Sequence, residues 1–500
     1  MIFYPIIFLT RDYSGEGSIE IIIFLKGQVM SEYKNSKLMH QFYRDVFSRE
    51  IDLGDIGGFP LSFVTAIIRG NTNILFINKE ICGYESGLEK NHDAALKQLL
   101  LTISLANIAL DEKFKGKKVR LPDDYIANIR SSLIEVINLK PCVEYLVVAI
   151  QLLFRIGDVE KVVELINNNF SILGDSPPVF RILLMICMIE EDYEPALPLV
   201  KEMTINQKLI GDHWFALLIV TCAIYKLGGY PDSYIDFRPL LKSNDFPSDD
   251  DYKWLIKQEE KNGKVTVIIS CDIKYYYEHA ISALYSIYET NKDNFNVHFH
   301  VYNIDDETYS DVLKKKASFP ELNISCTTEY FSGMKGMNVH YASRRFIFAR
   351  HALSVLNSPV LILDADCLFR KDLSDTIKQW HLSDLVLTES ESAPFWEKAL
   401  GGFVYLGGGL TSKIFIDKVA SFIHSNLISD NSVWFLDQVA LSAAIDAIGM
   451  PGDISRIDSA IVYDVNHVGY SLLWMVTTVK NANGKYSDYK KQLIEKYHSI

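Results

Sequence analysis

The stretch Val360-Leu361-Ile362-Leu363-Asp364-Ala365-Asp366 decides the fold, because four apolar residues with strand character end abruptly in two carboxylates one residue apart. In an α/β sheet, ligands bind outside the carboxyl ends of the strands, so such a strand delivers anionic oxygens to that edge. Mg²⁺ or Mn²⁺ is commonly held by one or two carboxylates together with substrate phosphates. Asp also caps turns and helices after strands, so the pattern alone leaves both interpretations open.

The composition limits the class of protein. A chain of 500 residues is longer than one hydrophobic core usually organises, so two or three domains are expected. A composition of 48% hydrophobic and 23% charged residues indicates a globular protein. A net charge of −13 argues against nucleic acid as a partner. The seven cysteines are scattered and lack Cys-x-x-Cys spacing, which favours a reducing compartment. No later apolar run reaches membrane-spanning length, so we expect a soluble, cytoplasmic protein.

Residues 1–30 form an N-terminal extension that the sequence does not assign. The first ten residues are apolar but lack the basic region and cleavage site of a secretory signal, and they are too short to span a bilayer. A second apolar run, residues 21–25, has strand character. The extension is either a small strand pair or a piece upstream of the true start.

Residues 31–250 are expected to form an all-α domain, because apolar residues recur there at three- and four-residue spacing. Residues 157–165 align with residues 191–199, and the offset of 34 residues is the period of tetratricopeptide-type helix pairs. Stacked helix pairs expose a groove suited to a peptide or protein partner. A plain helical bundle with coincidental spacing is the alternative.

The short acidic segment at residues 244–251 predicts a linker, and the periodicity changes after it. Residues 264–270 are β-branched and predict a buried strand, followed by a helix over 276–289 and strands over 297–301 and 323–327. Strands and helices that alternate in this way are typical of a mostly parallel sheet. We therefore expect an α/β domain over residues 262–500.

The motif order in this second domain resembles the GT-A glycosyltransferases, specifically the glycogenin and lipopolysaccharide galactosyltransferase type, whose fold is Rossmann-like. The resemblance covers about residues 264 to 470 and rests on five pieces in the expected order. These are Ser270-Cys271-Asp272 followed by Tyr275; the helix from Arg344 to Arg350; Leu363-Asp364-Ala365-Asp366; the strand Gly401-Gly402-Phe403; and Asp437-Gln438.

The resemblance implies roles for these residues. The ligands of the metal ion, Mn²⁺ or Mg²⁺, would be Asp364, Asp366 and a late histidine, His467. Those binding the nucleotide-sugar, a UDP-sugar, would be Ser270, Asp272, Tyr275, Arg350, Asp364, Ala365, Gly401 and Gly402. Asp437 and Gln438 would lie under the transferred sugar as the catalytic pair, and the reaction would retain the anomeric configuration.

The chain also departs from the family. An Asn-Ala-Gly stretch is replaced by Gly401-Gly402-Phe403, and no Lys-Pro-Trp element follows His467, so either Lys480 or Lys485 is left to neutralise phosphate. Arg344 and Arg345 compete with Arg350 for its role. Glu389 and Glu391 follow a predicted strand and are candidates for a general base, which an inverting reaction would need, or for acceptor binding.

We expect from this sequence a metal-dependent glycosyltransferase with a helical-repeat domain before it. The acceptor would be a protein recruited by the helices. One alternative is a surface glycan or lipid-linked acceptor. The alternative from another class is a non-catalytic scaffold that retains only the fold.

Overall fold

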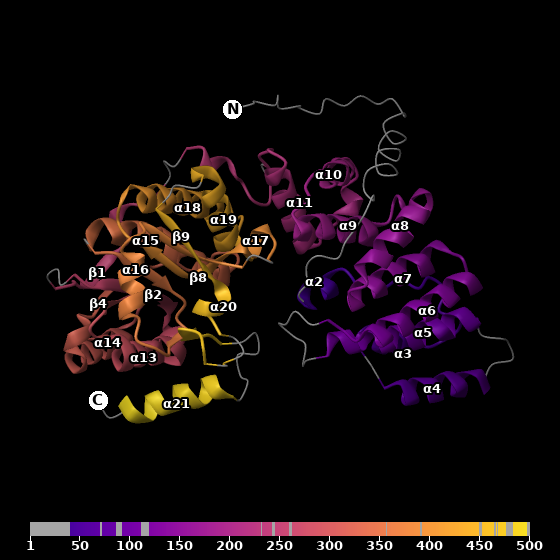
Figure 1. The fold of residues 1–500 in the computed structure, drawn as a ribbon, viewed down its shortest axis with the longest axis horizontal. Coiled ribbons are helices and arrows are strands. Elements are labelled where there is room, and N and C mark those ends of the chain that lie inside the picture. The colour runs from indigo at the N-terminus through magenta and orange to yellow at the C-terminus, as the bar shows by residue number, and fades with distance from the viewer. Residues whose placement is uncertain are drawn as a thin grey trace. The chain divides into compact units, whose positions relative to one another are not determined.

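The computed structural model describes residues 41–70, 73–86, 93–111, 120–231, 233–242, 246–259, 263–356, 358–390, 393–449, 453–464, 467, 469–476 and 484–497. The chain divides into two compact units, Met1–Gly229 and Tyr230–Ile500 (Figure 1). The N-terminal extension over residues 1–30 lies outside the described residues. No helix in the described ranges is both long enough and apolar enough to cross a membrane.

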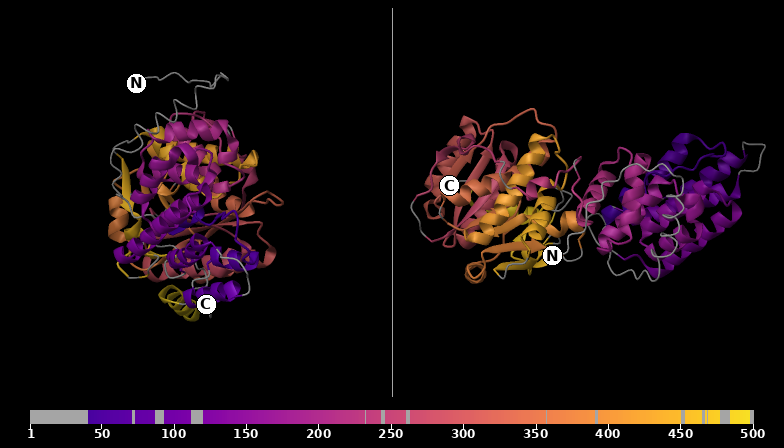
Figure 2. Two further views of the ribbon diagram at one scale, coloured as in Figure 1. Left: turned by 90° about the vertical axis from the view of Figure 1, so that its right-hand side faces the viewer. Right: turned by 90° about the horizontal axis from the view of Figure 1, so that it is seen from above.

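The described part of the first unit is built from helices joined by short connections, and Figure 2 shows them from two further sides in indigo to magenta. They are α2 (Gln41–Val46), α3 (Leu61–Ile68), α4 (Ile74–Ser86), α5 (Ala94–Ala106), η1 (Asn107–Leu110), α6 (Asp123–Leu139), α7 (Val143–Ile156), α8 (Val159–Leu173), α9 (Pro177–Glu190), α10 (Ala196–Ile205), η3 (Gln207–Leu209) and α11 (Trp214–Lys226).

The 34-residue offset in the sequence corresponds to two helix ends of the same geometry. Gly157 follows the last residue of α7 and Glu191 follows the last residue of α9, and both have a left-handed backbone, with φ of 84° and 58°. In each case the following aspartate N–H donates to a carbonyl five residues back, at 2.9 Å. This is the closing bond of a Schellman-type cap, so the repeated sequence encodes a repeated turn between helices.

The second unit alternates strands with helices. Its elements are η4 (Arg238–Leu240), η5 (Asp249–Asp251), β1 (Lys253–Ile256), β2 (Val265–Asp272), α12 (Ile273–Tyr275), the π-helical turn η6 (Tyr276–Ala280), α13 (Ile281–Asn291), β3 (Phe295–Tyr302), α14 (Asp306–Ser318), η7 (Pro320–Leu322), β4 (Ser325–Thr328), α15 (Met337–Val355), β5 (Val360–Leu363), β6 (Leu368–Phe369), α16 (Ser374–Trp380), β7 (Leu385–Glu389), α17 (Phe395–Lys398), β8 (Ala399–Leu406), α18 (Leu410–Ile428), α19 (Leu436–Ile448), β9 (Ile454–Asp458), α20 (Ser459–Val462), β10 (Leu473–Trp474) and α21 (Lys485–Tyr497).

Eight strands form one mixed sheet in the order β1-β4-β3-β2-β5-β8-β7-β9, and β10 pairs with β6 in a separate ribbon. The strands β4, β3, β2 and β5 are parallel neighbours, whereas β8 runs antiparallel to both β5 and β7. The predicted α/β character is therefore confirmed: the unit has a large sheet with a parallel core.

Helices cover both faces of this sheet, so its central strands β2, β3 and β5 are buried along nearly their whole length. The odd-numbered residues of β2 and β3 pack into one core with α13 and α21. Their even-numbered residues face the opposite side, where Phe348 of α15 stacks on His300 with ring centroids 3.8 Å apart. In Figure 1, α13 and α14 lie on one side of the strands and α15 and α18 on the other.

The second unit begins upstream of residue 262, the start that the sequence predicted. Residues 246–251, the described part of the expected linker, are attached to it. The Arg350 guanidinium lies 3.6 Å from the centroid of the Phe246 ring, and Asp249 pairs with His351 at 2.8 Å. Strand β1 then pairs antiparallel with β4 and closes that edge of the sheet.

Candidate functional site

A cavity of about 420 Å³ opens at the carboxyl ends of β2 and β5. It is lined by Ser270, Cys271, Asp272, Tyr275, Asn338, Val339, Tyr341, Ala342, Ser343, Arg345, Asp364, Ala365, Asp366, Trp434, Phe435, Leu436, Asp437, Gln438 and Met475. We call it the first cavity. The register explains this convergence: Ile269 pairs with Leu363, so the residues that follow each strand emerge side by side.

Eight residues that the sequence selected line this cavity together: Ser270, Asp272, Tyr275, Asp364, Ala365, Asp366, Asp437 and Gln438. Asp272 also caps the helix that follows, because its Oδ1 accepts a hydrogen bond from the Tyr275 N–H at 2.8 Å. This bond fixes Tyr275 at the cavity wall. Burial raises the pKa of Asp272.

Arg345 of α15 joins two of the carboxylates. Its Nη1 makes an ion pair with Asp364 Oδ1, and its Nη2 donates to Asp437 Oδ2 at 3.1 Å. The two aspartates follow different elements, β5 and the start of α19, so a single guanidinium fixes their relative position. The fork of donors in arginine suits such a bridge.

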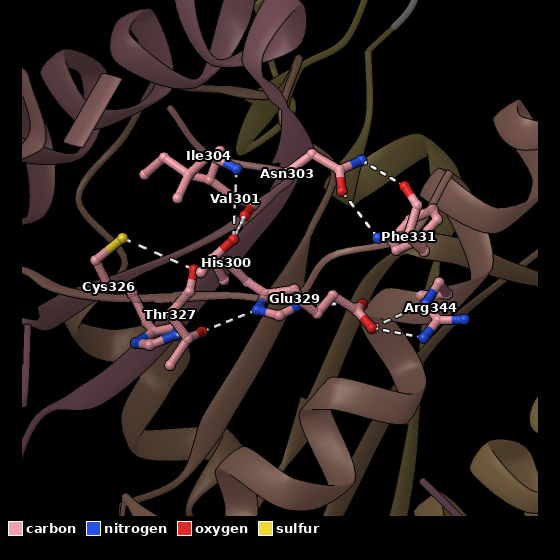
Figure 3. A network of polar contacts seen from close by, with 11 residues as sticks. His300, Val301, Asn303, Ile304, Cys326, Thr327, Glu329, Phe331 and Arg344 are labelled. Atoms are coloured by element: carbon pink, nitrogen blue, oxygen red, sulfur yellow. Dashed lines mark hydrogen bonds and ion pairs between the residues drawn. The ribbon is translucent and has the colours of Figure 1, made fainter. Parts of the chain in front are cut away.

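Figure 3 shows a buried chain of polar contacts that anchors α15 in the sheet. Glu329, which follows β4, accepts from Arg344 Nε at 2.9 Å and from Nη2 at 2.6 Å. It also contacts His300 Nε2 at 3.2 Å. Although burial acts to raise the pKa of Glu329, the bonds from His300 and Arg344 hold it below its usual value. Arg344 precedes Arg345, so this anchor holds the segment of α15 that carries Arg345.

Gly401 and Gly402 leave room for this arrangement. A Cβ atom at Gly401 would lie 2.9 Å from both Arg345 Nη2 and Asp437 Oδ2. At Gly402 it would overlap Asp364 Oδ2 and lie 2.8 Å from the Tyr463 hydroxyl. The absence of side chains at these two positions of β8 is therefore a requirement of the site.

The residues that remain for a metal ion are Asp364 and Asp366. Burial, and then the charge of Asp364, raise the pKa of Asp366 to about 7. A bound cation would relieve both effects, so the pair fits a divalent metal. No three His, Cys, Asp or Glu side chains are grouped for metal binding in the part of the chain that the structure describes. Further ligands would come from phosphate and water, as is common for Mg²⁺.

A second cavity of about 390 Å³ shares Arg345, Asp364, Gln438 and Met475 with the first. Its other lining residues are Leu400, Gly401, Gly402, Ser459, Tyr463, Asp464 and Tyr470. The two predicted glycines therefore lie on this second cavity, beside Asp364.

Several buried polar atoms on these cavities have no hydrogen-bond partner among the described residues. They are Ser270 Oγ, Ser343 Oγ, Arg345 Nε, Gln438 Oε1 and the Tyr463 hydroxyl. Buried polar atoms are rarely left unpaired, because each costs about 1–3 kcal/mol. Gln438 lines both cavities, so a bound ligand would supply the hydrogen-bond donor that its Oε1 lacks.

Other predicted residues lie elsewhere. Arg350 lines neither cavity, and its Nε donates to Asp417 at 2.7 Å. His467 contacts the Met475 carbonyl at 2.9 Å and packs against Trp474 and Tyr486. The structure brings neither residue to the carboxylates.

The two remaining candidates that the structure describes, Glu389 and Lys485, do not line the cavities. Glu389 lies within β7, pairs with Arg456 at 3.2 Å and lines neither cavity. Lys485 begins α21 and lines neither cavity. Glu391 and Lys480 lie outside the described residues.

Sequence reasoning missed the contribution of α21, because this polar helix carries no motif. The Tyr486 hydroxyl donates to the Asp366 carbonyl at 2.7 Å, so this helix holds the loop that carries both aspartates. Burial lowers the pKa of Lys490 on the same helix, while the charges of Glu278 and Asp366 act to raise it. The Lys490 ammonium group is therefore close enough to interact with Asp366.

No protein-family model matches the chain, and no curated protein matches it. Among solved structures, the glycosyltransferase GlyE of Streptococcus pneumoniae TIGR4 is similar over 48% of this chain, with 14% identity and a TM-score of 0.33. Its apo form is similar over the same share, with 15% identity and a TM-score of 0.32. The chain spans 64% of the length of each. Overlap of this extent assigns no activity to the chain.

Proposed function

We propose that the second unit is a GT-A type glycosyltransferase, which moves a sugar from a nucleoside diphosphate donor, a UDP-sugar, to an acceptor hydroxyl with Mn²⁺ or Mg²⁺. The observation that carries this is the first cavity itself. At the ends of two parallel strands it gathers Asp364 and Asp366 with Arg345, whose guanidinium also binds Asp437, and Gln438 lines the same cavity. A metal-bound diphosphate beside Asp364 and Asp366, with its sugar beside Asp437 and Gln438, fits this arrangement.

The donor would extend across the cavity from β2 to α19. Asp272, Tyr275 and Tyr341 line the wall near β2, where a carboxylate and two aromatic rings suit a nucleoside. Asp364 and Asp366 would hold the metal, which when bound neutralises charge on the departing diphosphate. Asp437 and Gln438 would then lie beside the transferred sugar.

The reaction exchanges one bond for another at the sugar C1. The bond from C1 to the diphosphate oxygen breaks, and its electron pair leaves with the diphosphate. The acceptor oxygen bonds to C1, and its proton passes to the departing diphosphate. The resemblance favours retention of the anomeric configuration, in which an oxygen of Asp437 or Gln438 stabilises positive charge at C1.

Arg345 prepares the site for this chemistry. Because it binds Asp364 and Asp437 at once, it keeps the metal-binding side and the sugar-binding side in a fixed relation. Preorganised charge of this kind is the main source of stabilisation in many enzymes.

The experiment is UDP release from UDP-glucose and UDP-galactose, with and without Mn²⁺, by the wild type and Asp437→Asn. We expect metal-dependent release, reduced about a hundredfold in the variant. Asp417→Asn is the matched control, since its carboxylate pairs with Arg350 away from both cavities. Release that is absent from the wild type, or that is equal in the three proteins, would overturn the proposal.

A further inference from the structure

The second cavity meets the first at the place where a donor sugar would lie. Arg345, Asp364 and Gln438 line both cavities, and Gly402 lines the second one beside Asp364. A molecule in the second cavity would thus face C1 of a sugar held beside Gln438. Resting on the proposed function, we propose that this cavity binds the acceptor and that the acceptor is an uncharged carbohydrate.

The first argument is a buried donor without a partner. The Tyr463 side chain is 7% exposed, and its hydroxyl has no partner among the described residues. The ring is held by an edge contact with Phe403, with centroids 6.4 Å apart. A hydroxyl fixed in this way is ready to bond a ligand oxygen and costs stability when it does not.

The second argument is the mixture of groups around that hydroxyl. Gln438 Oε1 is an acceptor that also lacks a partner, and Asp464 adds a buried carboxylate, one oxygen of which accepts from the Gly469 N–H at 2.9 Å. Ser459 supplies a further hydroxyl. Alternating donors and acceptors suit the several hydroxyl groups of a sugar ring, each of which both donates and accepts.

The third argument is an aromatic ring at the rim. Tyr470 lines the cavity and is 63% exposed. An exposed aromatic face offers apolar contact to the C–H face of a sugar while its hydroxyl stays in water. Together with Tyr463 it would contact one ring from two directions.

Charge excludes an anionic acceptor. Among the described lining residues, the only cation is Arg345, and two carboxylates already engage it. No other described lining residue carries a positive charge that could pair with an anionic group. A phosphorylated or carboxylated acceptor would therefore lack a cation to compensate its charge, whereas a neutral sugar needs none.

In the transfer, an acceptor hydroxyl oxygen forms the new bond to C1 while the bond from C1 to the diphosphate breaks. The acceptor proton leaves with the diphosphate, so no further reactant is needed.

The test uses the full chain with the nucleotide sugar that gives a Mn²⁺-dependent rise in melting temperature. Transfer is measured to neutral p-nitrophenyl glycosides, to glucuronides and to peptides containing Ser, Thr or Tyr. We expect transfer to a neutral glycoside, with an acceptor KM raised about tenfold by Tyr463→Phe and by Tyr470→Ala. The donor-induced rise in melting temperature should be unchanged in both variants.

Two matched variants serve as controls. Tyr145→Phe removes another buried hydroxyl without a partner, in the first unit, and Tyr330→Ala removes a ring that is 61% exposed but lines neither cavity. Transfer to peptides or glucuronides but to no neutral glycoside would overturn the inference, as would KM values no higher than those of the controls. If the wild type shows no donor-induced shift at all, the proposed function fails first, and the inference with it.

Discussion

Arg345 and Arg350 lie five residues apart on α15, yet only Arg345 reaches the first cavity. It bridges the partly exposed Asp364 and the buried Asp437, whereas Arg350 is attached to Phe246 and Asp417. Five residues correspond to about 140° of rotation around a helix, so the two side chains leave on different faces. The sequence named the helix but could not decide between its arginines, because the choice depends on which face meets the sheet.

The two arginines give a paired test. Arg345→Lys keeps the charge but loses the fork, so one ammonium cannot hold Asp364 and Asp437 together. We expect it to lower UDP release about a hundredfold and to reduce the free energy of unfolding by about 3 kcal/mol. Arg350→Lys changes the partly exposed ion pair with Asp417 and should lower the free energy of unfolding by at most about 1 kcal/mol. If the two variants lost the same free energy of unfolding and the same rate of UDP release, the assignment of Arg345 to the site would be contradicted.

Gly402 gives a second test at this scale. Gly402→Ala places a methyl group against Asp364 Oδ2, so the carboxylate must move and metal-dependent nucleotide binding should be lost. Gly83→Ala is the control, because Gly83 lies in α4 with nothing within 4 Å of an added Cβ. It should stabilise its helix by about 0.5–1 kcal/mol. Titration calorimetry with UDP and Mn²⁺ would show an unchanged affinity in Gly402→Ala if the steric argument is wrong.

At the scale of elements, the strands around the site followed from local patterns. The apolar run of β5 ending in two aspartates, and the β-branched run of β2, are signals that a buried strand needs and that short sequence windows contain. The position of His467 is different, because it depends on how residues 469–476 pack against α21, and no local pattern encodes that. For the same reason no local pattern pointed to Tyr463, because its place on the second cavity depends on how near its hydroxyl lies to Gly402.

Two buried histidines of the second unit, His298 and His279, predict a dependence of stability on pH. His298 is fully buried between the Ser325 and Thr327 hydroxyls, and burial lowers its pKa well below the usual 6.5. Burial also lowers the pKa of His279 to about 4. Below pH 6.5 the unfolded chain therefore binds more protons than the folded one, and the free energy of unfolding falls as the pH falls.

Urea unfolding at pH 7.5, 6.5 and 5.5 measures this effect. Each such histidine contributes up to about 1.4 kcal/mol per pH unit below 6.5. His298→Asn removes one titrating group, so its stability should decline less steeply with acid than that of the wild type, although it is less stable at pH 7.5. Equal slopes for the two proteins would contradict the buried, neutral state of His298.

At the scale of the whole molecule, both cavities belong to the second unit, since their lining residues fall between Ser270 and Met475. We propose that the first unit recruits a protein that carries the acceptor glycan. The sequence predicted a helical domain before the α/β domain, but it started the α/β domain at residue 262. The acidic segment that resembles a linker is held in the second unit by Arg350 and His351, which are distant in sequence.

Two fragments test the division. Residues 230–500 should fold and show the same metal-dependent nucleotide binding as the full chain. Residues 262–500 lack β1 and the contacts of residues 246–251, which exposes the edge of β4, so this fragment should melt at a lower temperature. Loss of nucleotide binding by a folded 230–500 fragment would contradict the independence of the second unit.

The most direct measurement of the central claim is thermal melting with UDP, GDP, CDP and ADP, each with and without Mn²⁺, for the wild type and Asp366→Asn. Ligand at a hundredfold excess over Kd stabilises the folded state by about 2.7 kcal/mol. We predict a rise in melting temperature with UDP that requires Mn²⁺ and is absent in Asp366→Asn. A folded wild type that shows no rise with any nucleotide, or a rise that survives in Asp366→Asn, would contradict the account.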